Sequence, residues 1–162
     1  MEFSSPSYSF EQALVKMEAW CAYQDRCLFE VQNKLDSWKI ESATQDKIIE
    51  KLILNRFLDE KRFVESYISG KVRIKRWGRV KIKHHLFQKH IDKKHIEEGL
   101  KSVDQEIYWN NLIALAIRKS SEIKPTENPW KSKQKIIAYL SSKGYEQDLI
   151  FEALKDVNTY NV

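Results

Sequence analysis

Glycine, proline and cysteine are all scarce in this sequence, with 4, 3 and 2 copies respectively among 162 residues. A protein made of β-strands needs turn-forming residues between most of its strands, so this scarcity argues against a β-sandwich or a β-barrel. Hydrophobic residues nevertheless make up 42% of the chain, which is enough apolar surface to build a core. We therefore expect an all-α protein of long helices and short loops, folded as one domain or as a few repeated units.

The sequence also lacks any apolar run near the roughly 18 residues that a membrane-spanning helix requires. Its first ten residues have neither the basic end nor the apolar stretch of a signal peptide. It contains no phosphate-binding glycine loop, nucleophile elbow or metal-binding motif, which argues against the enzyme classes that depend on them. We expect a cytoplasmic, monomeric protein that is not an enzyme and has no membrane partner.

The two cysteines, Cys21 and Cys27, are six residues apart. This offset places them about 240° apart around a helix, so they are not expected to pair across one turn. Because no zinc-type Cys/His spacing is present, we predict two buried, reduced thiols. Four histidines cluster in the sequence, but their offsets do not place a set of ligands on one helix face, so we expect no metal or other cofactor at His84, His85, His90 and His95.

One pattern of apolar residues occurs three times along the chain. In the second and third copies the spacings are identical, namely four, five, five and four residues, whereas the first copy has three extra residues before its fourth member. Steps of four are helical and steps of five bracket a turn, so each copy predicts a helix, a tight turn and a second helix. The copies are Val31, Leu35, Ile40, Ile48 and Leu52; Ile82, Leu86, Ile91, Ile96 and Leu100; and Ile136, Leu140, Tyr145, Ile150 and Leu154.

A further helical candidate precedes each copy, at residues 10–24, 60–76 and 104–120. The sequence therefore predicts three tandem three-helix repeats that form an elongated, curved molecule. One obvious loop interrupts the body, at residues 122–129. The expected boundaries are a flexible tail at 1–9, repeats at 10–57, 58–103 and 104–157, and a tail at 158–162.

The turn of the third repeat contains Gly144, and glycine is the residue that most easily adopts the left-handed conformation at a helix C-terminus. Lys39 and His90 hold the equivalent positions in the first two repeats. Because a side chain in that conformation costs about 1 kcal/mol, we expect these two turns to be looser or to end differently. Helix N-caps are predicted at Ser42 (with Gln45), Asp59 and Asp92.

Positive charge is concentrated in residues 66–91, which contain eight Lys or Arg and no carboxylate. The whole chain has 28 basic and 23 acidic residues, so the part outside this stretch has 20 basic residues against 23 acidic ones. A solvated helix face normally mixes the two signs, so the imbalance favours a surface for a polyanion, either phosphates or an acidic protein groove, over a basic face with no partner. We predict a partner-binding surface made of Lys71, Arg73, Lys75, Arg76, Trp77, Arg79, Lys81 and Lys83.

Two tryptophans lie beside this and another group of basic residues. Trp77 precedes Gly78, where the helix is expected to break, and it either wedges two helices apart or stacks on a base or a partner side chain. Trp130 opens a predicted helix and is followed by three lysines within five residues. For both residues we favour the structural role over the partner contact.

The ordered set of motifs resembles the RecX family, bacterial regulators of the recombinase RecA, over residues 10–157. The sharpest part of the resemblance is the stretch FLDEKRF at residues 57–63, and the spacing of the apolar residues after Gly78 is also similar. The motif positions of the family correspond here to Leu58, Asp59, Arg62, Phe63, Gly78, Ile82, Leu86 and Gly144.

The resemblance implies an elongated helical protein that lies in the groove of a RecA–DNA filament. Members of the family typically inhibit strand exchange and ATP hydrolysis by RecA, so it also implies an effect on recombination, DNA repair and the SOS response. Single-stranded or duplex DNA is a second candidate partner. The alternative is a general DNA-binding protein without RecA specificity, in which a helix-turn-helix unit enters a groove.

Overall fold

The structure is a computed structural model that describes residues 8–125 and 128–160, with side chains up to Val157. Within these ranges the chain forms nine helices and no strand, so the all-α prediction is confirmed. The helices are α1 (Phe10–Tyr23), α2 (Leu28–Ser37), α3 (Ser42–Leu54), α4 (Glu60–Arg73), α5 (Arg79–Gln88), α6 (Lys93–Lys101), α7 (Gln105–Glu122), α8 (Pro129–Lys143) and α9 (Gln147–Tyr160).

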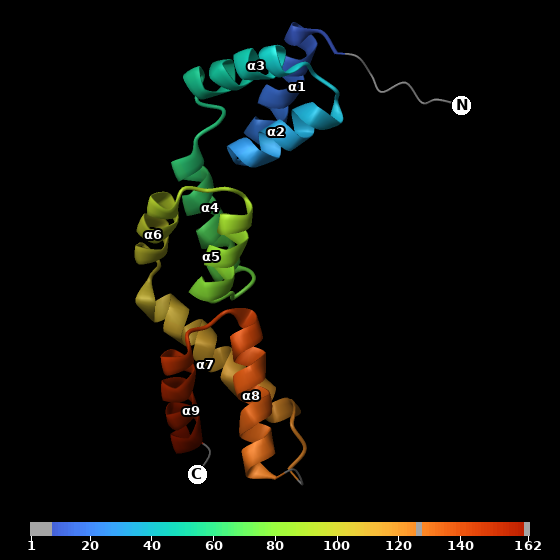
Figure 1. Cartoon of the computed structure of the whole chain (residues 1–162). Coiled ribbons are helices and arrows are strands. Elements are labelled where there is room, and N and C mark those ends of the chain that lie inside the picture. Colours follow the sequence, from blue (N-terminus) through green and yellow to red (C-terminus); the bar gives the residue numbers. More distant parts are fainter. Residues whose placement is uncertain (1–7, 126–127, 161–162) are drawn as a thin grey trace, which may run out of the picture.

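The helices form three groups of three, stacked one after another into an elongated molecule (Figure 1). Each group has its own hydrophobic core, because an amphipathic helix must bury its apolar stripe against its neighbours. The repeated apolar positions fill these cores: Leu35, Leu86 and Leu140 are all fully buried. Cys27 is the exception to the grouping, since it precedes α2 but packs into the core of the second repeat.

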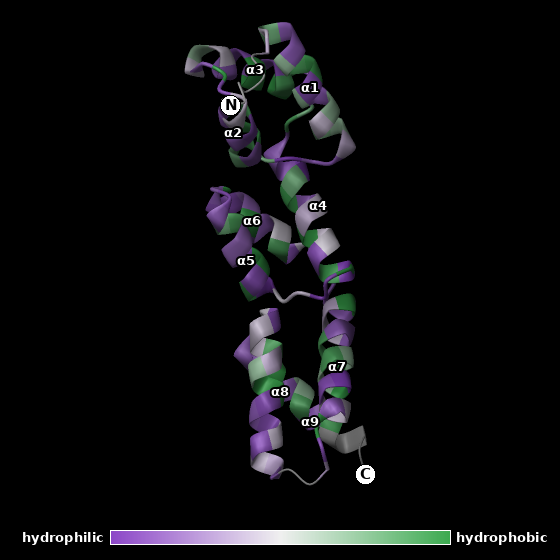
Figure 2. Cartoon of the chain, turned by 90° about the vertical axis from the view of Figure 1, so that its right-hand side faces the viewer, coloured by the Kyte–Doolittle hydropathy of each residue, from purple (hydrophilic) through white to green (hydrophobic). Residues whose placement is uncertain are grey.

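The second helices of the three repeats, α2, α5 and α8, lie on the same side of the stack (Figure 1). The C-terminus of α8 meets the N-terminus of α5, where the amide of Gly78 donates to the carbonyl of Lys143 at 2.8 Å. The C-terminus of α5 in turn meets the N-terminus of α2, where the rings of His90 and Phe29 are 4.7 Å apart. Hydrophilic residues predominate on α5 and α6 (Figure 2).

The three turns have one geometry, and the expectation of looser turns at Lys39 and His90 is wrong. Both residues adopt the left-handed conformation, with φ of 55° and 58°, as Gly144 does at 95°. In each turn the next residue donates its amide to a carbonyl five positions back, for example Ile91 to Leu86 at 3.3 Å, and its side chain is at least partly buried. Burial of that side chain and the hydrogen bond across the turn offset the roughly 1 kcal/mol of backbone strain.

Aspartates open several of the helices. Asp59 and Asp92 accept hydrogen bonds from backbone amides of the first turns of α4 and α6, as the sequence predicts, and Asp104 does the same for α7. The predicted cap at Ser42 is wrong, because this residue is the first of α3 and Glu41 precedes it without a side-chain cap. The side chain of Gln45 instead donates to the carbonyl of Ile40 and to Asp36.

Helix ends differ from the sequence prediction mainly around the basic stretch. The α4 helix ends at Arg73 rather than at residue 76, and residues 74–78 connect it to α5. Tyr8 and Ser9, assigned above to the tail, contact the first repeat: Ser9 caps α1 and the ring of Tyr8 packs against Trp38. Residues 126–127 of the predicted loop lie outside the described residues. No helix of the described part is long and apolar enough to cross a membrane.

Candidate polyanion-binding surface

The eight residues predicted to bind a partner lie where the second repeat meets the third. We call them the basic surface. Lys71 and Arg73 are in the last turn of α4, Lys75, Arg76 and Trp77 in the connection that follows, and Arg79, Lys81 and Lys83 in α5. Arg73, Lys75, Arg76 and Lys83 are exposed, whereas the other four residues are half-buried.

Trp77 is the centre of a cluster of cations. The ammonium groups of Lys71 and Lys81 lie 4.5 and 4.4 Å from the centroid of its ring, and the ring of His85 is 4.7 Å away. The indole packs against the core of the second repeat, which supports the predicted structural role of this tryptophan. Two ammonium groups lie against the ring, so Trp77 helps to position these cations.

The neighbouring cations of this cluster repel one another. Burial, followed by the charges of Lys75, Lys89 and Lys81, lowers the pKa of Lys71. Burial and the neighbouring cations likewise lower the pKa of His85. None of the ion pairs in the described part of the chain involves Lys71 or Lys81. An anion bound here would remove this repulsion.

Arg79 differs from the rest of the basic surface because it faces the molecule's own third repeat. Its guanidinium lies 3.2 Å from a carboxylate oxygen of Glu146 and 3.9 Å from the ring centroid of Tyr108. The Tyr108 hydroxyl accepts the Arg79 amide at 2.9 Å and donates to Glu146 at 2.6 Å. Burial and the hydrogen bond to Glu146 raise the pKa of Tyr108 well above its ordinary value. Arg79 therefore joins two repeats.

We call the contact between the second and third repeats the second joint. Hydrogen bonds to backbone groups complete it. The amide of Gly78 donates to Lys143, that of Val80 donates to Gly144 at 3.0 Å, and the hydroxyl of Tyr145 donates to the carbonyl of Arg76 at 2.9 Å. A Cβ added to Gly78 would overlap the carbonyl oxygen of Gly144. Both glycines are therefore required by the close approach of the two repeats.

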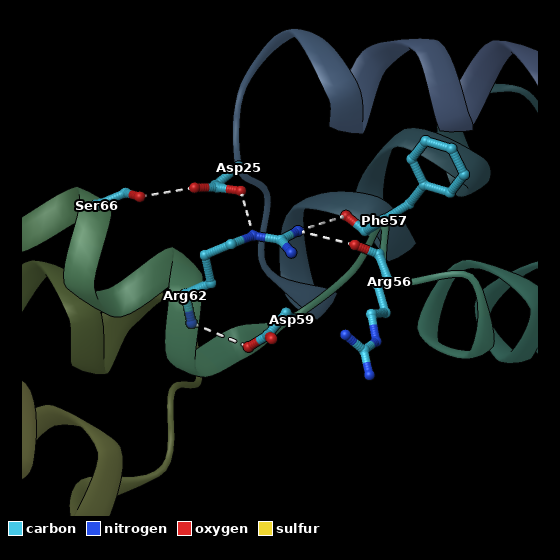
Figure 3. A network of polar contacts seen from close by, with 6 residues as sticks. All are labelled: Asp25, Arg56, Phe57, Asp59, Arg62 and Ser66. Carbon is cyan, nitrogen blue, oxygen red and sulfur yellow. Dashed lines mark hydrogen bonds and ion pairs between the residues drawn. The ribbon is translucent and has the colours of Figure 1, made fainter.

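The first joint, between the first and second repeats, is made by side chains (Figure 3). Asp25 accepts hydrogen bonds from Arg62 at 2.8 Å and from Ser66 at 2.6 Å. Arg62, a family-motif position, also donates to the carbonyls of Arg56 and Phe57. This guanidinium thus joins the connection between α1 and α2 to the connection between α3 and α4. An arginine suits the position because its several N–H donors can reach both connections at once.

A second ion pair supports the first joint. It joins Lys89 at the end of α5 to Glu30 in α2, with 2.9 Å between nitrogen and oxygen. Burial alone would lower the pKa of Lys89, but the hydrogen bond and charge of Glu30 outweigh it, and the pKa is raised. Lys89 is one of the eight basic residues of the 66–91 stretch, so this charge is also used within the molecule.

Replacing Asp25 with asparagine is expected to destabilise the protein by about 1–2 kcal/mol at neutral pH, since a charge-assisted hydrogen-bond pair is lost. The Ser66 hydroxyl, against burial and together with Arg62, holds the pKa of Asp25 below its ordinary value. The contribution of the Asp25 carboxylate to the free energy of unfolding is therefore present above about pH 4. It disappears as the pH falls through the lowered pKa. Urea unfolding of D25N and wild type from pH 7 to pH 2 should show the two curves converging in acid. Replacing the exposed Asp46 with asparagine should change neither the free energy of unfolding at neutral pH nor its dependence on pH.

The remaining candidates of the sequence take no part in this surface. Cys21 and Cys27 are free and buried, as predicted, and burial raises the pKa of both thiols to about 11. Trp130 is the second residue of α8, and 67% of its surface is exposed. No group of three or more His, Cys, Asp or Glu in the described ranges is arranged to hold a metal ion.

Comparison with known proteins matches the repeats directly. Two family models, "RecX, second three-helix domain" and "RecX, third three-helix domain", match residues 59–100 and 106–154, which together exceed half of the chain. The regulatory protein RecX of Serratia proteamaculans is 32% identical over 118 residues, which cover 72% of this chain and 67% of that protein. This chain belongs to the RecX family.

Further RecX proteins are similar over most of this chain. That of Clostridium botulinum is 30% identical over 81% of this chain and 61% of its own length, and that of Clostridium tetani is 36% identical over 79% and 57%. The chain therefore spans about three fifths of the length of these relatives. A crystal structure of RecX from Lactobacillus salivarius, 24% identical, superposes with a TM-score of 0.82 over 93% of this chain and 97% of that chain, which confirms the RecX fold.

The sequence predicted where basic residues are concentrated but not the contacts that Arg79 and Arg62 make within the molecule. Tyr108 and Glu146 lie 29 and 67 residues from Arg79, and Asp25 lies 37 residues from Arg62. No local spacing indicates such contacts. The one available signal was the pair of glycines at 78 and 144, which marks positions where two backbones approach closely.

Proposed function

We propose that this RecX protein binds the RecA–DNA filament in its groove and inhibits the recombinase and ATPase activities of RecA, with effects on recombination, DNA repair and the SOS response. The observation that supports the proposal best is the exposed part of the basic surface, on a stack of repeats whose sequence belongs to a family of regulatory proteins. Arg73, Lys75, Arg76 and Lys83 have no ion-pair partner among the described residues.

An elongated stack suits a partner that is itself long and repetitive. Each repeat can contact a successive protomer of a filament, so that weak contacts combine through a high effective concentration. A chain that ends after Val103 keeps the basic surface and loses the third repeat, and it also exposes the side of Arg79 and Gly78 that the third repeat covers. We therefore prefer the whole chain for functional tests.

The direct test is to titrate the protein into RecA hydrolysing ATP on single-stranded DNA. We expect the rate to fall in proportion to the bound protein, and an unchanged rate at saturating protein would contradict the proposal. Because the general DNA-binding alternative rests on the same charges, affinity is compared on naked and RecA-coated strands. A preference for the coated strand of tenfold or more supports the regulator, and equal affinity supports the alternative.

A further inference from the structure

The first repeat has a groove lined by apolar side chains. It lies between α2 and α3 and continues to the start of α4, and its apolar lining consists of Leu28, Ile49, Ile53, Leu54 and Leu58. Ile53 and Leu54 leave 55% and 71% of their surface exposed. Exposed apolar residues that gather in a hollow are typical of an interaction surface, so we call this feature the apolar groove.

Carboxylates border the apolar groove. They are Asp46, Glu50, Asp59 and Glu60, and Arg56 also lines it. The ion pairs of the described residues involve none of these four carboxylates. Such a border repels phosphates and anionic lipids and attracts cations, so the groove suits a surface that is both apolar and basic.

The outer face of α5 has the complementary pattern. Val80, Lys83, His84 and Phe87 are all exposed, and their spacing places them on one side of the helix. Val80 and Phe87 leave 55% and 70% of their surface exposed. The helix contains no aspartate or glutamate, and Lys83 forms no ion pair with any described residue. We call these four residues the α5 face.

We propose that this chain associates with a second copy of itself, with the α5 face of one copy seated in the apolar groove of the other. The two surfaces belong to different repeats of one molecule, and both stay exposed there (Figure 1). One chain thus carries both halves of an apolar contact with opposite charges, which is the condition for identical copies to bind each other.

The charges of the whole repeats agree with this contact. Residues 10–57 have seven basic and eight acidic residues, whereas residues 58–103 have thirteen and six. The first repeat of one copy therefore attracts the second repeat of another. Because Lys83 also belongs to the basic surface, self-association covers part of that surface. A self-associating chain differs from the monomer expected from the sequence, and it goes beyond the proposed function because it needs no RecA.

The test is sedimentation equilibrium of the whole protein, without RecA or nucleic acid, from roughly 5 to 500 µM, a range that covers weak, transient contacts. The weight-average mass of wild type should rise above the 19.3 kDa monomer. The variants D46K/E50K in the groove and K83E/H84E on the α5 face should each weaken association at least about 10-fold. The matched control E152K/D156K changes charge equally at the same spacing on exposed positions of α9, and it should associate as wild type does.

A mixture of the two charge variants tests the pairing of the surfaces. Neither variant associates alone, but the unchanged α5 face of D46K/E50K fits the unchanged groove of K83E/H84E, so the equimolar mixture should regain mass. The F87S variant tests the apolar part without a change of charge. It should weaken association about 30-fold, which corresponds to roughly 2 kcal/mol for the burial of one large apolar side chain.

Thermal melts distinguish lost association from misfolding. The substituted side chains are exposed, so the variants should melt with wild type. A wild type that stays monomeric over the whole range would overturn the inference. So would charge variants that associate as wild type does, or a mixture no heavier than its two components. These measurements contain no RecA, so their failure leaves the proposed function standing, and an unchanged rate of RecA ATP hydrolysis leaves this inference standing.

Discussion

Reversing the charges of Arg73, Lys75 and Lys83 to glutamate should weaken binding to a RecA-coated strand by about 100-fold or more. These side chains are exposed and make no ion pair among the described residues, so the change leaves the internal contacts of the protein intact. Each reversal removes an attraction and introduces a repulsion, together about 1 kcal/mol per site, and three such terms give about 3 kcal/mol, or roughly two decades in affinity.

The measurement is equilibrium binding to the coated strand at fixed salt, accompanied by a thermal melt. Replacement of Lys47, Lys61 and Lys94 by glutamate changes the net charge by the same amount on other exposed positions, and it should cost much less affinity. Equal losses in the two triple variants would show that only net charge matters and would remove the reason for assigning the contact to the basic surface.

Replacing Gly78 with alanine should destabilise the protein by about 3 kcal/mol. The new methyl group would overlap the backbone of Gly144 and Tyr145, and backbone atoms cannot rotate away as a long side chain can. Relief of the overlap requires the two repeats to separate, which weakens the hydrogen bonds from Gly78 and Val80 and disturbs the pairing of Arg79 with Glu146.

Gly70 provides the matched control. It lies inside α4, and an added Cβ there has no neighbour within 4 Å. Alanine is favoured over glycine in a helix by about 1 kcal/mol, so G70A should raise the free energy of unfolding while G78A lowers it. Urea unfolding of both variants gives the comparison, and a G78A protein as stable as wild type would show that the joint does not require close backbone contact.

Most of the fold follows from local patterns in the sequence. Helical spacing of apolar residues identified the second and third helices of each repeat. The buried residues Ile82, Leu86 and Ile96 belong to the repeated apolar pattern. The aspartate caps at residues 59 and 92 were equally predictable, because capping depends on a residue and its next few neighbours. The left-handed turns at Lys39 and His90 were not, since packing of the following side chain offsets the local strain.

The sequence by itself determined the helical repeats and the concentration of basic residues, because spacing along one chain and charge counting settle these features. Only the tertiary structure decided which cations stay available. It directs Arg79 to Glu146 and Lys89 to Glu30, and it gathers Lys71 and Lys81 around Trp77. The physical reason is that an ion pair or a cation–ring contact depends on distances of a few ångströms between residues that are distant in the chain, and no local pattern encodes those distances.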